Sequence, residues 1–135
     1  MFRRRALLLM TAMASCGGRR EPAADVFPET LAGWRRVSMR GAPVAESPDP
    51  VPQTSVVRVT AASYAGAGKL EARAYELTRS EVGLDIAQRW RPSADTVFFW
   101  ARRWFVVIRW EQADRKALRE FTTALEKRLN EASAR

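Results

Sequence analysis

The stretch Thr96–Trp110, TVFFWARRWFVVIRW, decides the fold because it reads as two strands joined by a short basic turn. β-Branched and aromatic side chains dominate residues 97–100 and 104–108, and such side chains fit a pleated sheet better than a helix. Residues 101–103 contain no Gly or Asn that adopts positive φ easily, so we expect a loop of roughly three to five residues rather than a two-residue turn. Both arms are apolar on both faces, which indicates a central hairpin covered on at least one side.

The faces of this hairpin follow from its register, which the sequence leaves open. If Trp100 lies across from Phe105, one face carries Phe98, Trp100, Phe105 and Val107, and the other carries Val97, Phe99, Val106 and Ile108. We expect the helices to cover one face only. The residues that border the first set are more polar than those that border the second. We therefore predict a partner-binding patch on this face, made of Phe98, Trp100, Arg102, Arg103 and Arg109. The alternative is that residues 27–39 or a proline-rich loop cover this face as core.

Three further segments read as strands or as the loops between them. Residues 34–39 form a strand after a short turn that begins near Phe27. Residues 41–53 contain four prolines, which exclude a regular helix or central strand and predict a surface loop. Residues 55–64 alternate between apolar and polar positions and pair with residues 69–77 as a hairpin across residues 65–68.

Two segments have helical spacing. In residues 81–90 an apolar stripe is formed by Val82, Ile86 and Trp90, with Ser80 as the expected N-cap. In residues 113–132 a longer stripe includes Phe121 and Leu125. The order strand, hairpin, helix, hairpin, helix predicts an α+β fold: a two-layer sandwich with an antiparallel sheet of about five strands and two helices. We expect this single domain to span residues 28–135.

The N-terminal segment, MFRRRALLLMTAMASC, has a basic start, a short apolar run and then small residues. This is the pattern of a secretory signal, and the run is too short for a helix that crosses a membrane, which needs about 20 residues. Without Arg3, Arg4 and Arg5, the 23 basic residues become 20 against 15 acidic ones, a net charge of +5. Because the remaining charges are interspersed, we interpret them as a solvated surface and predict no nucleic-acid partner.

The end of this segment, Met13-Ala14-Ser15-Cys16, resembles the lipobox of bacterial lipoproteins. The resemblance implies that residues 1–15 are removed and that Cys16 carries acyl chains such as palmitate, with residues 16–27 as a tether to the domain. Gly17 in place of Asp implies, by that family's sorting rule in Gram-negative cells, the outer membrane facing the periplasm. Met13 departs from the usual Leu of the motif. A lone buried Cys is the alternative, but the flexible residues 17–20 offer little to pack against.

The mature chain has little obvious chemistry. It contains no His, which excludes catalytic and metal sites built on imidazole, and acylation of Cys16 would leave no thiol. We therefore predict no cofactor, no metal site and no catalytic residue. The expected function is a lipid-anchored extracytoplasmic domain with a binding or envelope-assembly role. The alternatives are an exported carboxylate enzyme that uses Glu81, Asp85 or Asp95, and a cytoplasmic nucleic-acid-binding protein whose N-terminus is not a signal.

Overall fold

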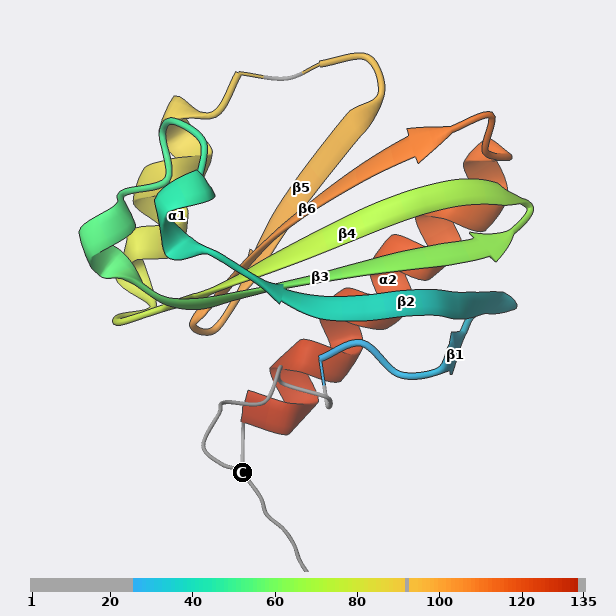
Figure 1. The fold of residues 1–135 in the computed structure, drawn as a ribbon, viewed down its shortest axis with the longest axis horizontal. Helices are drawn as coiled ribbons and strands as arrows, with labels where there is room; N and C mark the ends of the chain where they lie inside the picture. Colours follow the sequence, from blue (N-terminus) through green and yellow to red (C-terminus); the bar gives the residue numbers. More distant parts are fainter. Residues whose placement is uncertain (1–25, 92, 134–135) are drawn as a thin grey trace, which may run out of the picture.

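A computed structural model describes residues 26–91 and 93–133, so Cys16, the signal segment and most of the tether lie outside the described residues. The fold is α+β, with an antiparallel six-stranded sheet in the order β1-β2-β3-β4-β6-β5 and two α-helices (Figure 1). The strands are β1 Thr30–Leu31, β2 Trp34–Ala42, β3 Val56–Gly66, β4 Gly68–Leu77, β5 Thr96–Ala101 and β6 Trp104–Glu111. The helices are α1 Glu81–Arg89 and α2 Arg115–Ser133. The count of six rather than five strands is due to the short edge strand β1.

The β5–β6 hairpin has the register that places Trp100 across from Phe105. Its turn is shorter than expected, because Ala101 pairs with Trp104 and only two residues remain between them. Arg102 adopts a φ of 57°, a left-handed conformation that costs a non-glycine residue on the order of 1–2 kcal/mol. The prediction of a longer loop was therefore wrong. It ignored how strongly two aromatic, β-branched arms favour pairing up to the turn.

The β3–β4 hairpin forms as predicted, but its strands pair as far as Gly66 and Gly68, so its turn is tighter than the predicted residues 65–68. Gly68 has a φ of 132°, and a Cβ at this position would lie 2.6 Å from the carbonyl oxygen of Gln112. Only glycine fits both the backbone conformation and this close approach. The amide of Asp114 donates to the carbonyl of Ala67 at 2.9 Å, so this turn also holds the start of α2.

Helix α1 is the crossover between two parallel strands. β4 and β5 are both antiparallel to β6, which lies between them, so β4 and β5 run in the same direction. The connection from β4 to β5 must therefore return the chain along the sheet, and α1 does this over one face. Ser80 precedes α1, but it has helical dihedral angles and no capping hydrogen bond from its side chain, so the predicted N-cap was wrong.

We call the face of the sheet that packs against α2 the α2 face. Its core contains Trp34, Tyr64 and Phe121 in edge-to-face contact, with Trp34–Phe121 centroids 6.0 Å apart and Tyr64–Phe121 centroids 4.9 Å apart. The indole Nε1 of Trp34 donates to the carbonyl of Ala117 at 3.2 Å, which fixes the helix against β2. The carboxylate of Asp114 accepts from the amide of Ala117 at 2.9 Å and caps the first turn of α2.

The opposite face, which we call the α1 face, has a separate core. Val82 and Ile86 of α1 pack there with Tyr75, Phe105 and their neighbours. The proline-rich loop also contributes, through Val44 and the buried Val51. The two helices thus lie on opposite faces of the sheet (Figure 1), and do not form the single helical layer expected from the sequence.

Candidate binding cleft

The α1 face is only partly covered, because α1 is short. Its nine residues extend about 14 Å, whereas the eight residues of β6 extend about 27 Å. The 19 residues of α2 on the other face extend about 28 Å, about twice the length of α1. The part of the α1 face that α1 does not reach is hollowed into a cleft between the strands, the end of α1 and the proline-rich loop.

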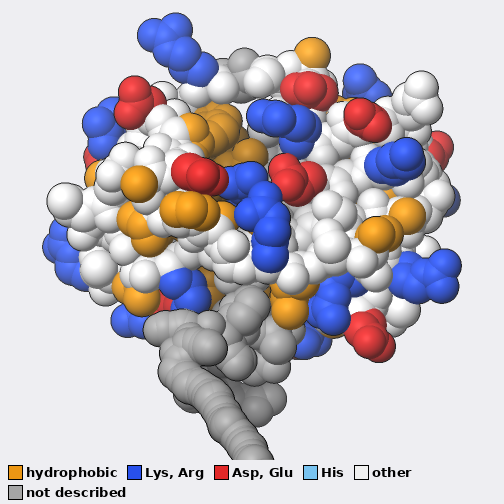
Figure 2. Space-filling model, viewed as in Figure 1, with side chains coloured by type: hydrophobic (Ala, Val, Ile, Leu, Met, Phe, Trp, Pro, Cys, Tyr) orange, Lys and Arg blue, Asp and Glu red, His pale blue; other side chains and the backbone are white. Residues whose placement is uncertain are grey.

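The cleft has a volume of about 380 Å³, within the range of small-molecule sites. Three parts of the chain line it: strands β4 and β6, the segment from the end of α1 to the start of β5, and the proline-rich loop. The lining residues are Glu46, Pro48, Asp49, Glu71, Arg73, Tyr75, Trp90, Ser93, Thr96, Val107 and Arg109. Figure 2 shows this side of the molecule, with acidic and basic side chains close together around a hollow that contains hydrophobic side chains.

The strands contribute two arginines to the cleft. Arg109 lies across from Glu71 in the β4–β6 register, and Arg73 lies two residues further along β4. Arg73 makes a long ion pair with Glu71, with Nε 3.8 Å from Oε1. Arg109 is exposed and makes no ion pair with any residue that the structure describes. The sheet side of the cleft therefore offers one free guanidinium and one that is weakly paired.

Aromatic side chains form the boundary between the cleft and the core of the α1 face. The ring of Trp90 packs on Phe98 and Phe105, with centroid distances of 5.7 and 5.4 Å. Tyr75 is buried beside them, and burial raises the pKa of its hydroxyl, although the Arg73 guanidinium acts in the opposite direction. Trp90 is only half-buried, so part of its indole remains available to a ligand.

The proline-rich loop contributes carboxylates. Glu46 and Asp49 are exposed and make no ion pair within residues 26–91 and 93–133. The loop is held in place by the buried Val51 and by two internal hydrogen bonds, from Ser47 Oγ to the Val44 carbonyl at 2.7 Å and from Gln53 Nε2 to the Ala45 carbonyl at 3.2 Å. This wall of the cleft is thus packed against the core.

A second hollow of similar size continues from the cleft along the sheet. It shares Glu71 and Arg109 with the cleft and extends across β2 and β3 to Val37, which is 67% exposed. The apolar lining of this hollow includes Ala65, Leu70 and Trp110. The cleft and this hollow therefore adjoin each other at Glu71 and Arg109.

The predicted partner-binding patch is spread over the length of the hairpin. Arg109 lies in the cleft, and Phe98 stacks on Phe105 at 5.5 Å in the core beside it. Trp100 lies at the opposite end, because it pairs with Phe105 whereas Arg109 pairs with Thr96. It is 39% exposed and packs against Gly83 of α1. The exposed Arg102 and Arg103 lie at the turn beyond it.

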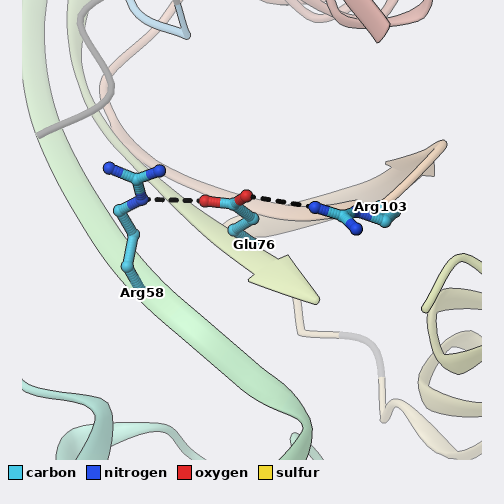
Figure 3. Close-up of polar contacts among 3 residues, drawn as sticks. All are labelled: Arg58, Glu76 and Arg103. Atoms are coloured by element: carbon cyan, nitrogen blue, oxygen red, sulfur yellow. Dashed lines mark hydrogen bonds and ion pairs between the residues drawn. The ribbon is translucent and has the colours of Figure 1, made fainter. Parts of the chain in front are cut away.

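Arg103 has a structural contact within the sheet. It approaches the carboxylate of Glu76 at 3.5 Å, and Arg58 approaches the other oxygen of the same carboxylate at 2.8 Å (Figure 3). The side chain of Glu76 is only 13% exposed, so this central acid joins β3, β4 and the β5–β6 turn. Of the arginines in the predicted patch, Arg109 rather than Arg103 is free to meet a ligand.

The three acids considered for catalysis have separate local partners. Glu81 pairs with Arg79 at 3.4 Å, and Asp85 pairs with Arg89 at 2.8 Å. The carboxylate of Asp95 accepts from the hydroxyl of Thr96 at 3.1 Å. None of the three lines the cleft, whose acids are Glu46, Asp49 and Glu71.

Sequence reasoning missed most of the cleft. It named Arg109 alone among the lining residues as a binding residue, and the one further signal was in β4, where Lys69, Glu71 and Arg73 alternate with Leu70, Ala72 and Ala74. Charged residues at alternating positions mark a strand whose second face is open to solvent. No comparable signal pointed to Glu46 and Asp49, because their position depends on how the loop packs over distant strands.

Comparison of the chain with models of known protein families, with curated proteins and with solved structures found no match. Among residues 26–91 and 93–133, no helix is long and apolar enough to cross a membrane. In the same part of the chain, no group of three or more acidic, Cys or His side chains is placed to hold a metal ion.

Proposed function

We propose that this protein is a lipid-anchored domain of the bacterial cell envelope that binds a ligand or partner without catalysis. The observation that carries the proposal is the string Met13-Ala14-Ser15-Cys16 followed by a compact domain. The arrangement of the domain supports a binding role. Val26 and Phe27, where the described chain begins, are buried on the α2 face, whereas the cleft opens on the α1 face.

The distance from the anchor also supports this role. Val26 follows Cys16 by ten residues, which reach at most about 35 Å when extended. An acylated Cys16 would therefore hold the domain close to the membrane surface, and two or three acyl chains would make the attachment stable. Because the chain enters on the α2 face, the cleft is accessible to molecules on the side away from the anchor.

Metabolic labelling with palmitate tests the anchor. The wild-type protein should be labelled and processed, and the Cys16→Ser variant should remain an unlabelled precursor. Label that persists in Cys16→Ser would refute the assignment. The Trp100→Ser variant is the matched control and should be labelled normally. Full-length, unprocessed protein in the cytosolic fraction would instead favour the nucleic-acid-binding alternative.

Membrane fractionation tests the proposed location. In a Gram-negative host the wild-type protein should be found in the outer membrane. The Gly17→Asp variant should move to the inner membrane while it keeps its lipid label. An unchanged location of Gly17→Asp would contradict the sorting assignment and leave the lipid assignment to the labelling experiment.

The exposed end of the hairpin is the second surface that we propose for a protein partner. Trp100 and Leu84 are large apolar side chains that are 39% and 47% exposed, and Arg102 and Arg103 lie at the adjacent turn. Crosslinking of the anchored protein to its neighbours in the envelope, with Trp100→Ser and Arg102→Gln as variants, tests this surface. A crosslinked partner that disappears in both variants supports it, and one that persists in both refutes it.

A carboxylate-dependent enzyme is the alternative function, because Glu46, Asp49 and Glu71 line one cavity. Paired carboxylates of this kind can act as a general acid and base. A screen of chromogenic glycosides and esters with the purified domain separates the two functions. Turnover that is lost in Glu71→Gln would replace the binding role by catalysis.

A further inference from the structure

We propose that the cleft binds a compact zwitterion, in which a carboxylate and an ammonium group lie a few bonds apart and an apolar side chain packs on Trp90. The inference rests on the proposed binding function and specifies its ligand class. Free amino acids and short peptides have this chemistry.

The first argument is the separation of charge within the cleft. The sheet side carries Arg73 and Arg109, and the loop side carries Glu46 and Asp49. These opposite charges line the same cavity, yet none of them pairs with its counterpart across it within the described part of the chain. A ligand that carries both charges would satisfy both sides at once.

The second argument is that a ligand with one charge fits poorly. A simple carboxylate would pair with Arg109 but would leave Glu46 and Asp49 on the loop side without a cation. A simple amine would pair with Asp49 or Glu46 but would share the cavity with two guanidinium groups. Each ligand of this kind gains one attraction and leaves the charges of the opposite wall unpaired.

The third argument is the apolar portion of the lining. Trp90, Val107 and Pro48 provide nonpolar surface, and the indole is supported from behind by Phe98 and Phe105. A tryptophan fixed in this way offers a rigid platform for an apolar side chain, and its face also attracts a cation. The loop that carries the acids is packed through Val51, so the backbone of this wall is held in place before a ligand binds, which lowers the cost of binding.

Three probes of one shape test the proposal: phenylalanine, phenylpropionate, which lacks the amine, and phenethylamine, which lacks the carboxylate. Isothermal titration with the full-length, lipid-anchored protein in detergent should give the tightest binding for phenylalanine. We expect an advantage of about tenfold over each singly charged analogue, equivalent to one good charged contact. Perturbation of the Trp90 indole signal in NMR spectra locates the binding, and an unfolding midpoint for each protein confirms that it is folded.

Two variants that each remove one charge show which side of the cleft binds the carboxylate of the ligand and which binds its ammonium group. Arg109→Gln should remove the advantage of phenylalanine over phenethylamine, and Asp49→Asn should remove its advantage over phenylpropionate. Arg119→Gln, which changes an exposed arginine on α2, outside the cleft, is the matched control and should leave all three affinities unchanged. This pattern is specific to the two sides of the cleft, because a general loss of fold would lower the affinity for all three probes equally.

Equal binding of the three probes, or phenylalanine binding that is unchanged in both cleft variants, would overturn the proposal. If the folded protein binds none of the three probes, the proposal of a zwitterionic ligand is also wrong. The anchored binding function would survive that result, because palmitate labelling and partner crosslinking test it independently.

Discussion

The two faces of the sheet share the same six strands but differ in what covers them. On the α2 face one 19-residue helix forms a continuous core from Leu118 to Leu129. On the α1 face a nine-residue helix and a loop cover one half, and the other half forms the cleft. The comparison shows that the length of a crossover helix can determine where a cleft forms, since a helix that spanned all of β6 would fill this one.

The composition of the strands matches this difference. Along β4 the positions that face α2 are Leu70, Ala72 and Ala74, all of them buried. The alternate positions change from charged, at Glu71 and Arg73, to buried aromatic and aliphatic, at Tyr75 and Leu77. The change occurs where the cover provided by α1 begins, so the strand itself marks the boundary between core and cleft.

The largest effect should come from truncation on the α2 face. Phe121 is fully buried and contacts both Trp34 and Tyr64, so Phe121→Ala should lower the free energy of unfolding by about 3–5 kcal/mol. Leu125→Ala should cost about 2–5 kcal/mol for the same reason. Thr123→Ala, on the exposed side of α2, is the control and should change stability little. Urea denaturation that gives the wild-type midpoint for both core variants would mean that α2 does not dock on the sheet.

The stability of the fold at alkaline pH gives a second comparison of the two faces, because Tyr64 belongs to the α2 face and Tyr75 to the α1 face. Burial raises the pKa of Tyr64 from 10.0 to about 12 despite the nearby Arg36 and Arg128. The folded chain therefore keeps this phenol neutral. The resulting stability is fully present below pH 10 and is lost as the pH rises towards 12, by on the order of 2–3 kcal/mol.

Tyr64→Phe should lack this loss, so the difference in stability between wild type and variant should shrink between pH 10 and 12. Tyr75, whose pKa is also raised by burial, contributes equally to both proteins and cancels. Denaturation with urea at several pH values measures the difference. A constant difference across this range would show that Tyr64 titrates normally.

A smaller effect should come from Trp100, at the exposed end of the α1 face. It is 39% exposed and packs on Gly83, so Trp100→Ser should cost about 1–2 kcal/mol, less than Phe121→Ala. The two variants are compared by their denaturation midpoints. A cost for Trp100→Ser as large as that for Phe121→Ala would mean that this end of the hairpin is core and would end its proposed role as a partner surface.

The smallest effect should come from the bridge at Glu76. Because Arg58 and Arg103 are largely exposed, solvent screens their attraction to this acid, and Glu76→Gln should cost no more than about 1 kcal/mol. A double-mutant cycle of Glu76→Gln with Arg103→Gln isolates the pair across the turn. Its coupling energy should decrease as salt is added, and a coupling that is independent of salt would contradict an exposed ion pair.

Local features of this fold were predictable from the sequence, and non-local ones were not. Alternation and aromatic content identified both hairpins, and helical spacing identified α1 and α2. The insertion of β6 between β4 and β5 was not predictable, because periodicity within a strand does not say which strand it pairs with. The placement of the helices on opposite faces follows from that insertion, and so does the cleft. Arg109 was identified because it lies on the hairpin that decided the fold. Asp49 was not, because its place in the cleft depends on how Val51 packs under a distant helix.

The close approach of Gly68 to Gln112 and Ala113 links the turn between β3 and β4 to the position of α2. At this corner the segment that leads into α2 lies directly against the backbone of the turn. The helix then extends about 28 Å from this corner. A methyl group at Gly68 would push away the backbone at Gln112 and Ala113 and so shift the start of α2. Gly68 thus helps to determine where α2 begins, while the Trp34–Ala117 hydrogen bond and the core of the α2 face determine how it lies on the sheet.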